Sequence, residues 1–280
     1  MNEKVEGVRQ EKYRNEIKLI KDKLSKFEEN EKVGILHEIF DDTPYKTRDY
    51  DKYSHDEYYI VHNKKQLIEE AGKKFKLKPK EMTKQSITSL IKHRKSLRDY
   101  SNKEVDFETF STIIHYTFGL KNIESGIYNE KFFPFKYVNS QGGLNYLDMY
   151  IIVNGVEKVP DGLYYYDFLN NQICLIEQGH MRTILSEIHF ANEFVAYGAF
   201  SCFIIADLSR VMPKYYKRAY RMAHVDSGIV IGYLQLLAEA SGIHSCVVAG
   251  FLEHKLDKLL HLAANEIPII SVTFGEKYYD

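Results

Sequence analysis

The sequence predicts an α+β fold, and three observations lead to it. Short β-branched and aromatic runs are typical of strands, and the runs 162–167 and 172–177 are joined through Asn170 and Asn171 as a hairpin. Helical patterns separate other strand-like runs, the longest from about 219 to 240. Because the hairpin breaks any strict alternation of strand and helix, an α+β arrangement fits better than a doubly wound sheet.

The composition describes a folded protein with no signature of a nucleic-acid partner. The 280 residues are 44% apolar and 14% aromatic, which is enough to fill a substantial core. The formal net charge of −1 gives no basic footprint for a nucleic acid. Three cysteines stand far apart in apolar runs, as buried thiols of a reducing compartment do: Cys174, Cys202 and Cys246.

The start of the chain and its apolar runs favour a cytoplasmic protein. The N-terminus is charged from the third residue onward, unlike a signal peptide. No apolar run reaches the roughly 18–20 residues that a membrane span needs. We therefore expect no membrane partner.

The first third of the chain predicts a helical extension. Residues 1 to about 33 carry balanced charge, and four apolar residues with helical spacing indicate a weak amphipathic helix: Tyr13, Ile17, Ile20 and Leu24. The lysine-rich run 73–84 contains Pro79 and is typical of a solvated connector. We therefore expect an N-terminal extension over 1–83, which packs on the core or on a partner, and a main domain over 84–280.

No metal site is expected. His37-Glu38 begins a pattern that would need a second histidine, but Asp41 stands at that position. The remaining histidines show no metal-ligand spacing on one element.

A basic run follows the first helix of the main domain. Apolar residues at 87, 90 and 91 predict the helix, and two arginines, a lysine and a serine come after it: Arg94, Lys95, Ser96 and Arg98. Such a set can hold a phosphate through charge-assisted hydrogen bonds. It is also what an ordinary basic helix end looks like, because cations complement the helix dipole. A second helix is predicted over 106–120, with Asp106 as its cap.

Adjacent glycines lie just before the next strand. In 139–146, Gly142 and Gly143 follow Ser140, and the run 147–154 is apolar. Glycines allow the backbone to lie flat against a planar ligand, and they equally make a turn. Helical segments over 180–200 and a buried strand over 201–206 come later in the chain.

The stretch 214–251 combines a cluster of cations and aromatic residues with the longest predicted helix and a strand. Cations and aromatic residues open it, and an apolar, glycine-containing helix over 219–240 follows, which we expect to be buried on all sides. A strand over 244–248 ends at Ala249 and Gly250. A helix over 252–262 and a strand over 268–274 complete the fold.

The stretch 214–251 resembles the SagB/McbC-like flavin dehydrogenases, the nitroreductase-fold enzymes of azole-containing peptide biosynthesis. Their pattern has Lys-Tyr, then R-G/A-Y-R-x-A-x-x-x-x-G, a long apolar helix and a glycine-rich turn before an aromatic residue. Lys214-Tyr215, the run 218–223, Gly228 and the run 249–251 fit this pattern. Earlier, 94–98 matches R-x-S-x-R/K, and 162–167 matches G-L-Y-x-Y-D.

The resemblance implies a nitroreductase-like fold, with a central mixed or antiparallel sheet surrounded by helices. It also implies a homodimer with FMN bound between the protomers. The phosphate anchor would be Arg94, Lys95, Ser96 and Arg98. The flavin platform would be Ser140, Gly142, Ala249 and Gly250.

The catalytic residues implied by the resemblance are Lys214 and Tyr215. A lysine among cations in a partly dry cleft has its ammonium form disfavoured, which makes it a usable base. Lys214 would take a proton from a thiazoline or oxazoline ring of a ribosomally made, bacteriocin-like peptide while FMN accepts a hydride. A complex with a cyclodehydratase is a further implied partner.

Two alternatives remain open. The family has Tyr-Pro where this chain has Asn145-Tyr146, which leaves room for an NAD(P)H-dependent nitro or quinone reductase of the same fold. The other alternative is a flavin-free scaffold subunit of a cyclodehydratase complex.

Overall fold

The computed structural model describes residues 15, 17–41, 65–82, 84–125, 132–190 and 192–278. The chain divides into two units, Met1–Lys46 and Thr47–Asp280, and each is described by itself. The expected boundary near residue 83 stays a prediction, and before it β1 (Lys74–Lys76) pairs with a strand of the main sheet.

The N-terminal unit is helical. Residues 17–24 form a helix, and α2 (Glu29–Asp41) follows after a break at 25–28. The expectation of one helix running to about residue 33 was therefore wrong, and Tyr13 lies outside the described residues. Both helices expose apolar side chains, among them Leu19 and Val33.

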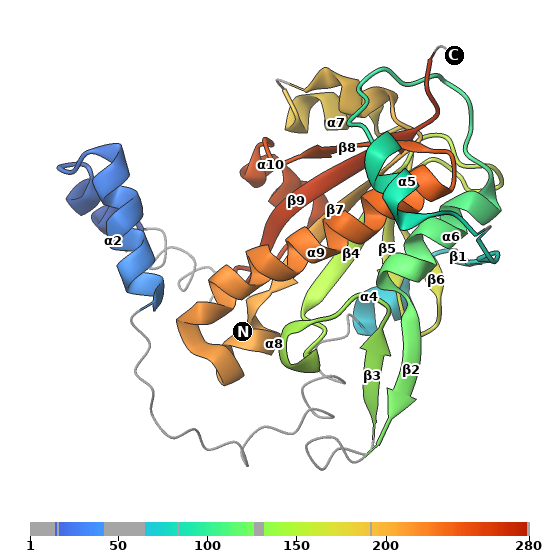
Figure 1. Ribbon diagram of the computed structural model, residues 1–280. Helices are drawn as coiled ribbons and strands as arrows, with labels where there is room; N and C mark the ends of the chain where they lie inside the picture. Colours follow the sequence, from blue (N-terminus) through green and yellow to red (C-terminus); the bar gives the residue numbers. More distant parts are fainter. Residues whose placement is uncertain are drawn as a thin grey trace. The chain divides into compact units, whose positions relative to one another are not determined.

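The main unit is built around a seven-stranded sheet (Figure 1). The strand order is β1-β6-β5-β4-β7-β9-β8, and every neighbouring pair is antiparallel. The prediction of an α+β fold with a central antiparallel sheet is confirmed, including the hairpin of β5 and β6. The strands after β1 are β4 (Leu147–Val153), β5 (Gly162–Asp167), β6 (Gln172–Gln178), β7 (Phe200–Asp207), β8 (His244–Val248) and β9 (Glu266–Gly275).

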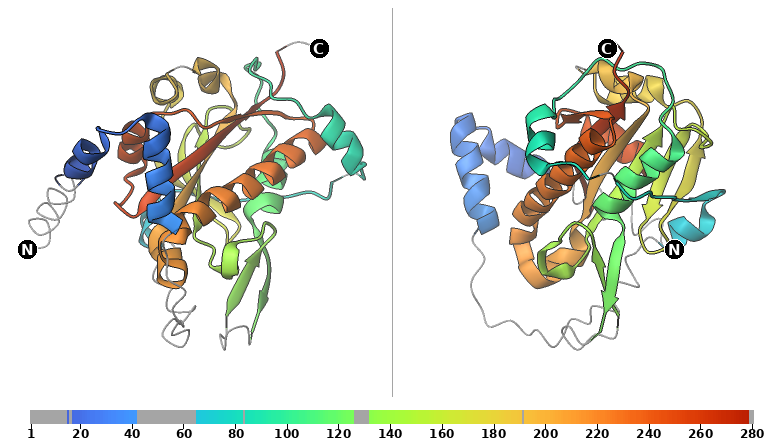
Figure 2. Two further views of the ribbon diagram at one scale, coloured as in Figure 1. Left: turned by 60° about the vertical axis from the view of Figure 1, so that its left-hand side comes forward. Right: turned by 45° about the vertical axis from the view of Figure 1, so that its right-hand side comes forward.

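Helices cover both faces of this sheet (Figure 2). Side chains alternate between the faces of a strand, so Met149 and Ile151 of β4 pack into the cluster that includes α6 and α9. Tyr150 and Ile152 pack into the cluster that includes α7 and α10. The helices are α4 (Lys65–Glu70), α5 (Ile87–His93), α6 (Phe107–Phe118), α7 (Arg182–Ile188), α8 (Leu208–Tyr215), α9 (Ala219–Ala240) and α10 (Glu253–Leu260), with short 3₁₀ turns η3 (Gln141–Gly143), η4 (Glu193–Tyr197) and η5 (Tyr216–Arg218).

A second, two-stranded sheet precedes β4 in the chain. It consists of β2 (Leu120–Glu124) and β3 (Phe133–Lys136). Every residue of β2 after Leu120 is exposed, whereas most of β3 is buried. The sequence analysis did not anticipate this hairpin.

The long helix α9 is not buried on all sides, which corrects the expectation from its composition. Ala223, Val230 and Leu234 are fully buried against the sheet. On the opposite side Val225 and Tyr233 are 51% and 41% exposed. A Cβ added to Gly228 or Gly232 would meet nothing within 4 Å. Gly228 and Gly232 therefore lie on the exposed face of α9, where another backbone could approach closely.

Candidate active site

Lys214 and Tyr215 occupy the last turn of α8. Asp207 caps the first turn, because its Oδ1 accepts a hydrogen bond of 3.0 Å from Ser209 N. The helix ends at Tyr216, whose φ of +52° is uncommon for a residue with a side chain. A short capped helix and a sharp turn thus fix the direction of the two side chains, both of which are half-buried.

The Lys-Tyr pair converges on Gly142. A Cβ on Gly142 would stand 2.5 Å from Tyr215 Oη and 3.0 Å from Lys214 Nζ. Gly142 also has a φ of +61°, so both its conformation and its surroundings require glycine. Three residues that the sequence analysis selected from two distant motifs therefore lie together.

Asp226 of α9 holds the loop that carries Gly142. Its Oδ2 accepts hydrogen bonds of 2.8 Å from Gln141 N and of 2.8 Å from Tyr146 Oη. The side chain is fully buried, and burial raises the pKa of Asp226 although its hydrogen bonds act in the lowering direction. On the same loop, Asn145 N donates to Ser140 Oγ at 3.2 Å. The loop is thereby fixed to the N-terminal half of α9.

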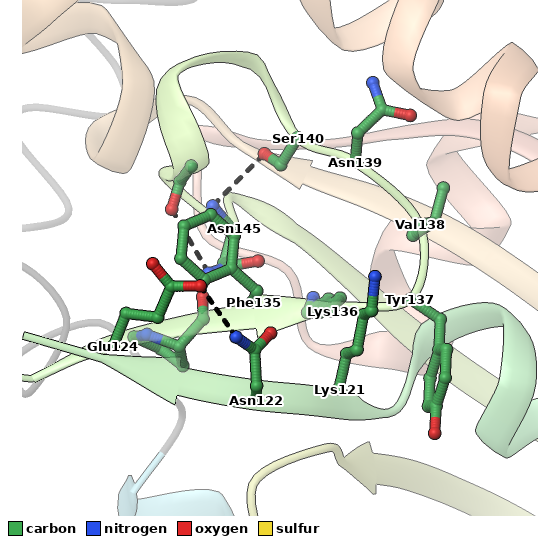
Figure 3. Close-up of a pocket in the computed structure, with 12 residues that line it drawn as sticks. Lys121, Asn122, Glu124, Phe135, Lys136, Tyr137, Val138, Asn139, Ser140 and Asn145 are labelled. Carbon is green, nitrogen blue, oxygen red and sulfur yellow. Dashed lines mark hydrogen bonds between the residues drawn. The ribbon is translucent and has the colours of Figure 1, made fainter. Parts of the chain in front are cut away.

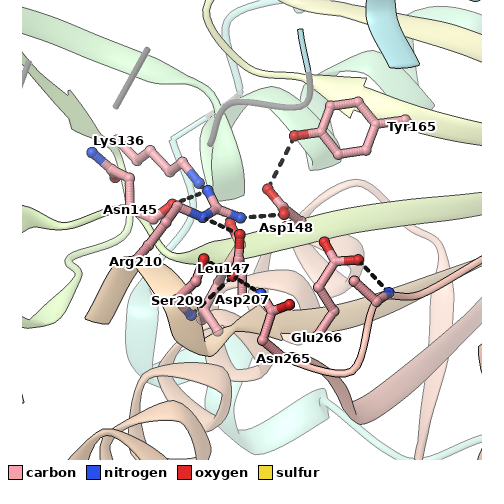
Figure 4. Close-up of polar contacts among 11 residues, drawn as sticks. Lys136, Asn145, Leu147, Asp148, Tyr165, Asp207, Ser209, Arg210, Asn265 and Glu266 are labelled. Carbon is pink, nitrogen blue, oxygen red and sulfur yellow. Dashed lines mark hydrogen bonds and ion pairs between the residues drawn. The ribbon is translucent and has the colours of Figure 1, made fainter. Parts of the chain in front are cut away.

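Arg210 joins α8 to the sheet (Figure 4). Its guanidinium pairs with Asp148 of β4 and, at 3.1 Å, with Asp207 Oδ2. It also donates to Asn145 O at 2.9 Å. Burial alone would raise the pKa of Asp207, but Arg210 and the hydrogen bonds from Ser209 lower it below its usual range. One buried cation therefore connects α8, β4 and the Gly142 loop.

A second buried cation lies under the same loop. Lys136 Nζ donates to Leu147 O at 3.1 Å, and it stands 3.6 Å and 4.2 Å from the ring centroids of Phe118 and Phe168. Burial lowers the pKa of Lys136 well below its usual value.

The predicted phosphate anchor forms an extended segment after α5. Ser96 pairs with Ser245 of β8, and Leu97 N donates to Ser245 O at 3.3 Å. Of the anchor side chains, Arg94 is half-buried and the others, Lys95, Ser96 and Arg98, are exposed. Two guanidinium groups, an ammonium and a hydroxyl on one segment suit a phosphate group.

Ala249 and Gly250 follow β8 and are exposed. A Cβ on Gly250 would meet only Asn192 Nδ2, at 3.8 Å. The backbone at this position is therefore open to a ligand.

The anchor and the Lys-Tyr pair lie at opposite ends of α9 in one chain. Gln141 contacts Asp226 near the start of the helix, whereas Gln85, just before α5, donates to Ala240 O at 3.0 Å at its end. The 14 residues from Asp226 to Ala240 span about 20 Å along a helix axis. Figure 1 shows α8 and α5 at these two ends. The two predicted groups of site residues are therefore separated in one chain by most of the length of α9.

A cavity of about 350 Å³ adjoins the Gly142 loop (Figure 3). One side is the β2–β3 hairpin and the other is the segment that leads into the loop. Lining residues include Lys121, Asn122, Glu124, Pro134, Phe135, Lys136, Tyr137, Val138, Asn139, Ser140, Gly143 and Asn145. Sequence reasoning missed this hollow because it depends on the hairpin.

Two further properties concern the described residues as a set. None of their helices combines the length and apolarity that a membrane crossing requires. Their His, Cys, Asp and Glu side chains form no group of three that could hold a metal ion.

Comparisons with known proteins agree with this architecture. The nitroreductase family matches residues 91–276. A protein of Methanocaldococcus jannaschii, by name a nitroreductase, is 26% identical over 188 residues, which cover 67% of this chain and 89% of its own.

Two solved structures share the fold at low identity. One, named as a nitroreductase of Anabaena variabilis, superposes with a TM-score of 0.60 at 21% identity over 73% of this chain, and the match spans only 42% of that protein. The other belongs to the Escherichia coli microcin synthetase McbBCD complex with truncated pro-MccB17 bound. It has a TM-score of 0.57 and 15% identity, and it covers 85% of this chain and 100% of its own.

The fold and the family match define the class of protein: this is an oxidoreductase with the nitroreductase fold. The chain belongs to the nitroreductase family.

Proposed function

We propose that this protein is an FMN-dependent dehydrogenase that oxidises thiazoline or oxazoline rings of a peptide to thiazoles or oxazoles. The observation that carries the proposal is the convergence of Lys214 and Tyr215 on Gly142. The resemblance to the SagB/McbC-like group puts part of the flavin platform, Ser140 and Gly142, on this loop. A structural neighbour in the microcin synthetase complex, which is named with a truncated pro-peptide bound, supports the substrate class.

The residues fit FMN in two places. The cations at 94, 95 and 98, together with Ser96, have the chemistry to hold its phosphate. Gly250 leaves backbone uncovered after β8, since a Cβ there would meet only Asn192 Nδ2 at 3.8 Å, as a platform for a planar ring system requires. When bound, FMN would supply the hydride acceptor for the substrate ring, with oxygen as the final oxidant.

The chain's own part in the reaction is proton removal and orientation. Lys214 Nζ takes the ring proton that leaves as the double bond forms, and Tyr215 Oη orients the ring or relays the proton. The hydrogen bonds of Asp226 to Gln141 N and Tyr146 Oη keep the loop in place during this step. A fixed loop contributes because misplacement of reacting groups by about 1 Å can cost on the order of 100-fold in rate.

The complete site requires a second copy of the chain. Within one chain the anchor and the Lys-Tyr pair are at opposite ends of α9, and the exposed face of α9 carries Gly228 and Gly232. A two-fold axis across this face would bring the anchor of one protomer to the Lys-Tyr pair of its partner. We therefore include a homodimer with shared FMN sites in the proposal.

The first test is the absorbance spectrum of the purified protein, with the released cofactor identified. We expect flavin bands and FMN. Lys214→Ala should keep the bound flavin and lose turnover of a thiazoline peptide, whereas the neighbouring Lys217→Ala should behave as wild type. A protein that takes up no flavin on reconstitution would contradict the proposal and favour the scaffold alternative.

A second assay separates the two enzymatic alternatives. An NAD(P)H-dependent reductase would reduce a dye with NADPH and leave a thiazoline peptide unchanged. The dehydrogenase needs no nicotinamide and consumes oxygen with the peptide.

A further inference from the structure

The cavity beside the Gly142 loop shares its wall with the candidate active site. Ser140 and Gly143 line the cavity, and Gly142 between them faces Lys214 and Tyr215. Asp226 fixes the same loop through Gln141 N. A ligand that extends past the Lys-Tyr pair therefore meets a preformed hollow one loop away, with a volume of about 350 Å³, inside the usual range of roughly 300–1,000 Å³ for ligand pockets.

The lining of the cavity suits a neutral polar ligand. It carries two lysines, Lys121 and Lys136, and one carboxylate, Glu124. Lys136 is buried, its Nζ donates to Leu147 O, and burial lowers its pKa well below the usual value, so a phosphate-rich ligand would find little net attraction. Asn122 donates to Glu124 Oε1 at 2.8 Å, and Asn139 provides a second exposed amide (Figure 3). Amide side chains both donate and accept hydrogen bonds, as peptide groups do.

Aromatic and apolar surface completes the hollow. Phe135 and Tyr137 are half-buried, and Pro134 and Val138 lie beside them. Apolar walls with a few polar groups are the usual composition of a site that orients a ligand. A peptide chain offers side chains to such walls and backbone amides to the asparagines.

We propose that this cavity is the subsite that binds the peptide segment flanking the reacting ring. The inference rests on the proposed function, because a ring embedded in a peptide needs room for the chain next to the Lys-Tyr pair. The occupant is a neutral, polar peptide segment and not a nucleotide.

The test uses two probes on the FMN-loaded protein. One is a fluorescently labelled synthetic peptide of Gly, Ser and Asn residues around a single thiazoline, and the other is an isolated thiazoline carboxamide. Peptide affinity is measured by fluorescence anisotropy, and oxidation of each probe by product absorbance. The variant is Asn122→Ala/Glu124→Ala, and both residues are exposed on β2, where substitutions change stability by about 0.5 kcal/mol or less.

A matched control is Glu177→Ala/Gln178→Ala, an exposed carboxylate and amide on β6, which contributes no lining residue. The cavity variant should bind the peptide at least tenfold more weakly, with oxidation of the isolated ring within twofold of wild type. The control should match wild type for both probes.

The outcomes separate the subsite from the proposed function. If the peptide binds through the cavity and neither probe is oxidised, the subsite stands and the azoline activity is wrong. Unchanged peptide affinity in the cavity variant overturns the subsite whatever the activity. An equal loss in the control, or no peptide binding by wild type, also overturns it. NADPH binding is measured for the same proteins. If the cavity variant binds NADPH more weakly and the control does not, the cavity is a nucleotide site and the peptide subsite is wrong.

Discussion

Gly142 is the residue at which the candidate site is most tightly constrained. A side chain there needs space that Tyr215 Oη and Lys214 Nζ occupy, and its φ of +61° disfavours any residue except glycine by roughly 1–2 kcal/mol. A change of one methyl group therefore acts on both the loop and the Lys-Tyr pair.

Gly142→Ala should lower turnover of a thiazoline peptide at least tenfold, because the new Cβ displaces Tyr215 or the loop. Stability should fall by about 1–2 kcal/mol in urea unfolding. The control is Gly72→Ala, since a Cβ there meets nothing within 4 Å. Wild-type turnover in Gly142→Ala would show that the Lys-Tyr pair does not act at this loop.

Asp226 combines a structural hydrogen-bonding role with an unfavourable buried charge. The raised pKa means that the folded state holds the proton more tightly than the unfolded state, so stability falls as the pH rises from about 4 towards the folded pKa. Asparagine keeps an acceptor for Gln141 N and Tyr146 Oη but carries no charge.

Asp226→Asn should therefore raise Tm at pH 7 by a few degrees, at about 2–4 °C per kcal/mol, and the gain should shrink below about pH 4. Asp226→Ala should instead lower Tm at both pH values, because it removes both hydrogen bonds. The measurement is thermal unfolding at the two pH values. If Asp226→Asn raised Tm equally at both pH values, the gain would not come from removal of the buried charge.

At the scale of elements, α8 and β4 depend on the buried Arg210. Its two carboxylate partners, Asp148 and Asp207, are almost fully buried with it. A buried pair contributes little net stability when intact, but removal of one partner leaves a buried charge that costs about 3–5 kcal/mol.

Arg210→Met should destabilise the protein by about 3–5 kcal/mol in urea unfolding, and it should also weaken turnover because α8 carries Lys214. The control is Lys255→Ala, which breaks the surface pair with Glu187 at 3.0 Å and should cost about 1 kcal/mol or less. Equal effects of the two variants would contradict the role given to Arg210.

The elements also show how far a single sequence leads. Periodicity and turn residues predicted the β5–β6 hairpin, the strands β4, β7, β8 and β9, and the length of α9, because these signals are local. Arg210 and Asp148 are 62 residues apart, and no local pattern pairs them. The open face of α9 was missed for a similar reason: apolar residues on all sides do not reveal whether a second face is covered by the same chain.

At the scale of the whole molecule, the exposed face of α9 offers a test of whether the protein is a monomer or a homodimer. Glycine inside a helix costs about 0.5–1 kcal/mol relative to alanine, and Gly228 and Gly232 have free space around them in one chain. Alanine at these positions should therefore stabilise an isolated chain, whereas it should crowd a partner helix packed against them.

We expect Gly228→Ala/Gly232→Ala to raise the dimer dissociation constant at least tenfold in sedimentation experiments. The FMN content should fall with the dimer, because in the proposed homodimer the anchor of one protomer and the Lys-Tyr pair of its partner would hold the cofactor together. Gly34→Ala, at a helical glycine of α2 that also has nothing within 4 Å, should leave both quantities unchanged. Two results would contradict the shared site: a wild-type monomer that retains FMN, or a double variant that gains stability and keeps its FMN. Either result would mean that one chain binds FMN without a partner.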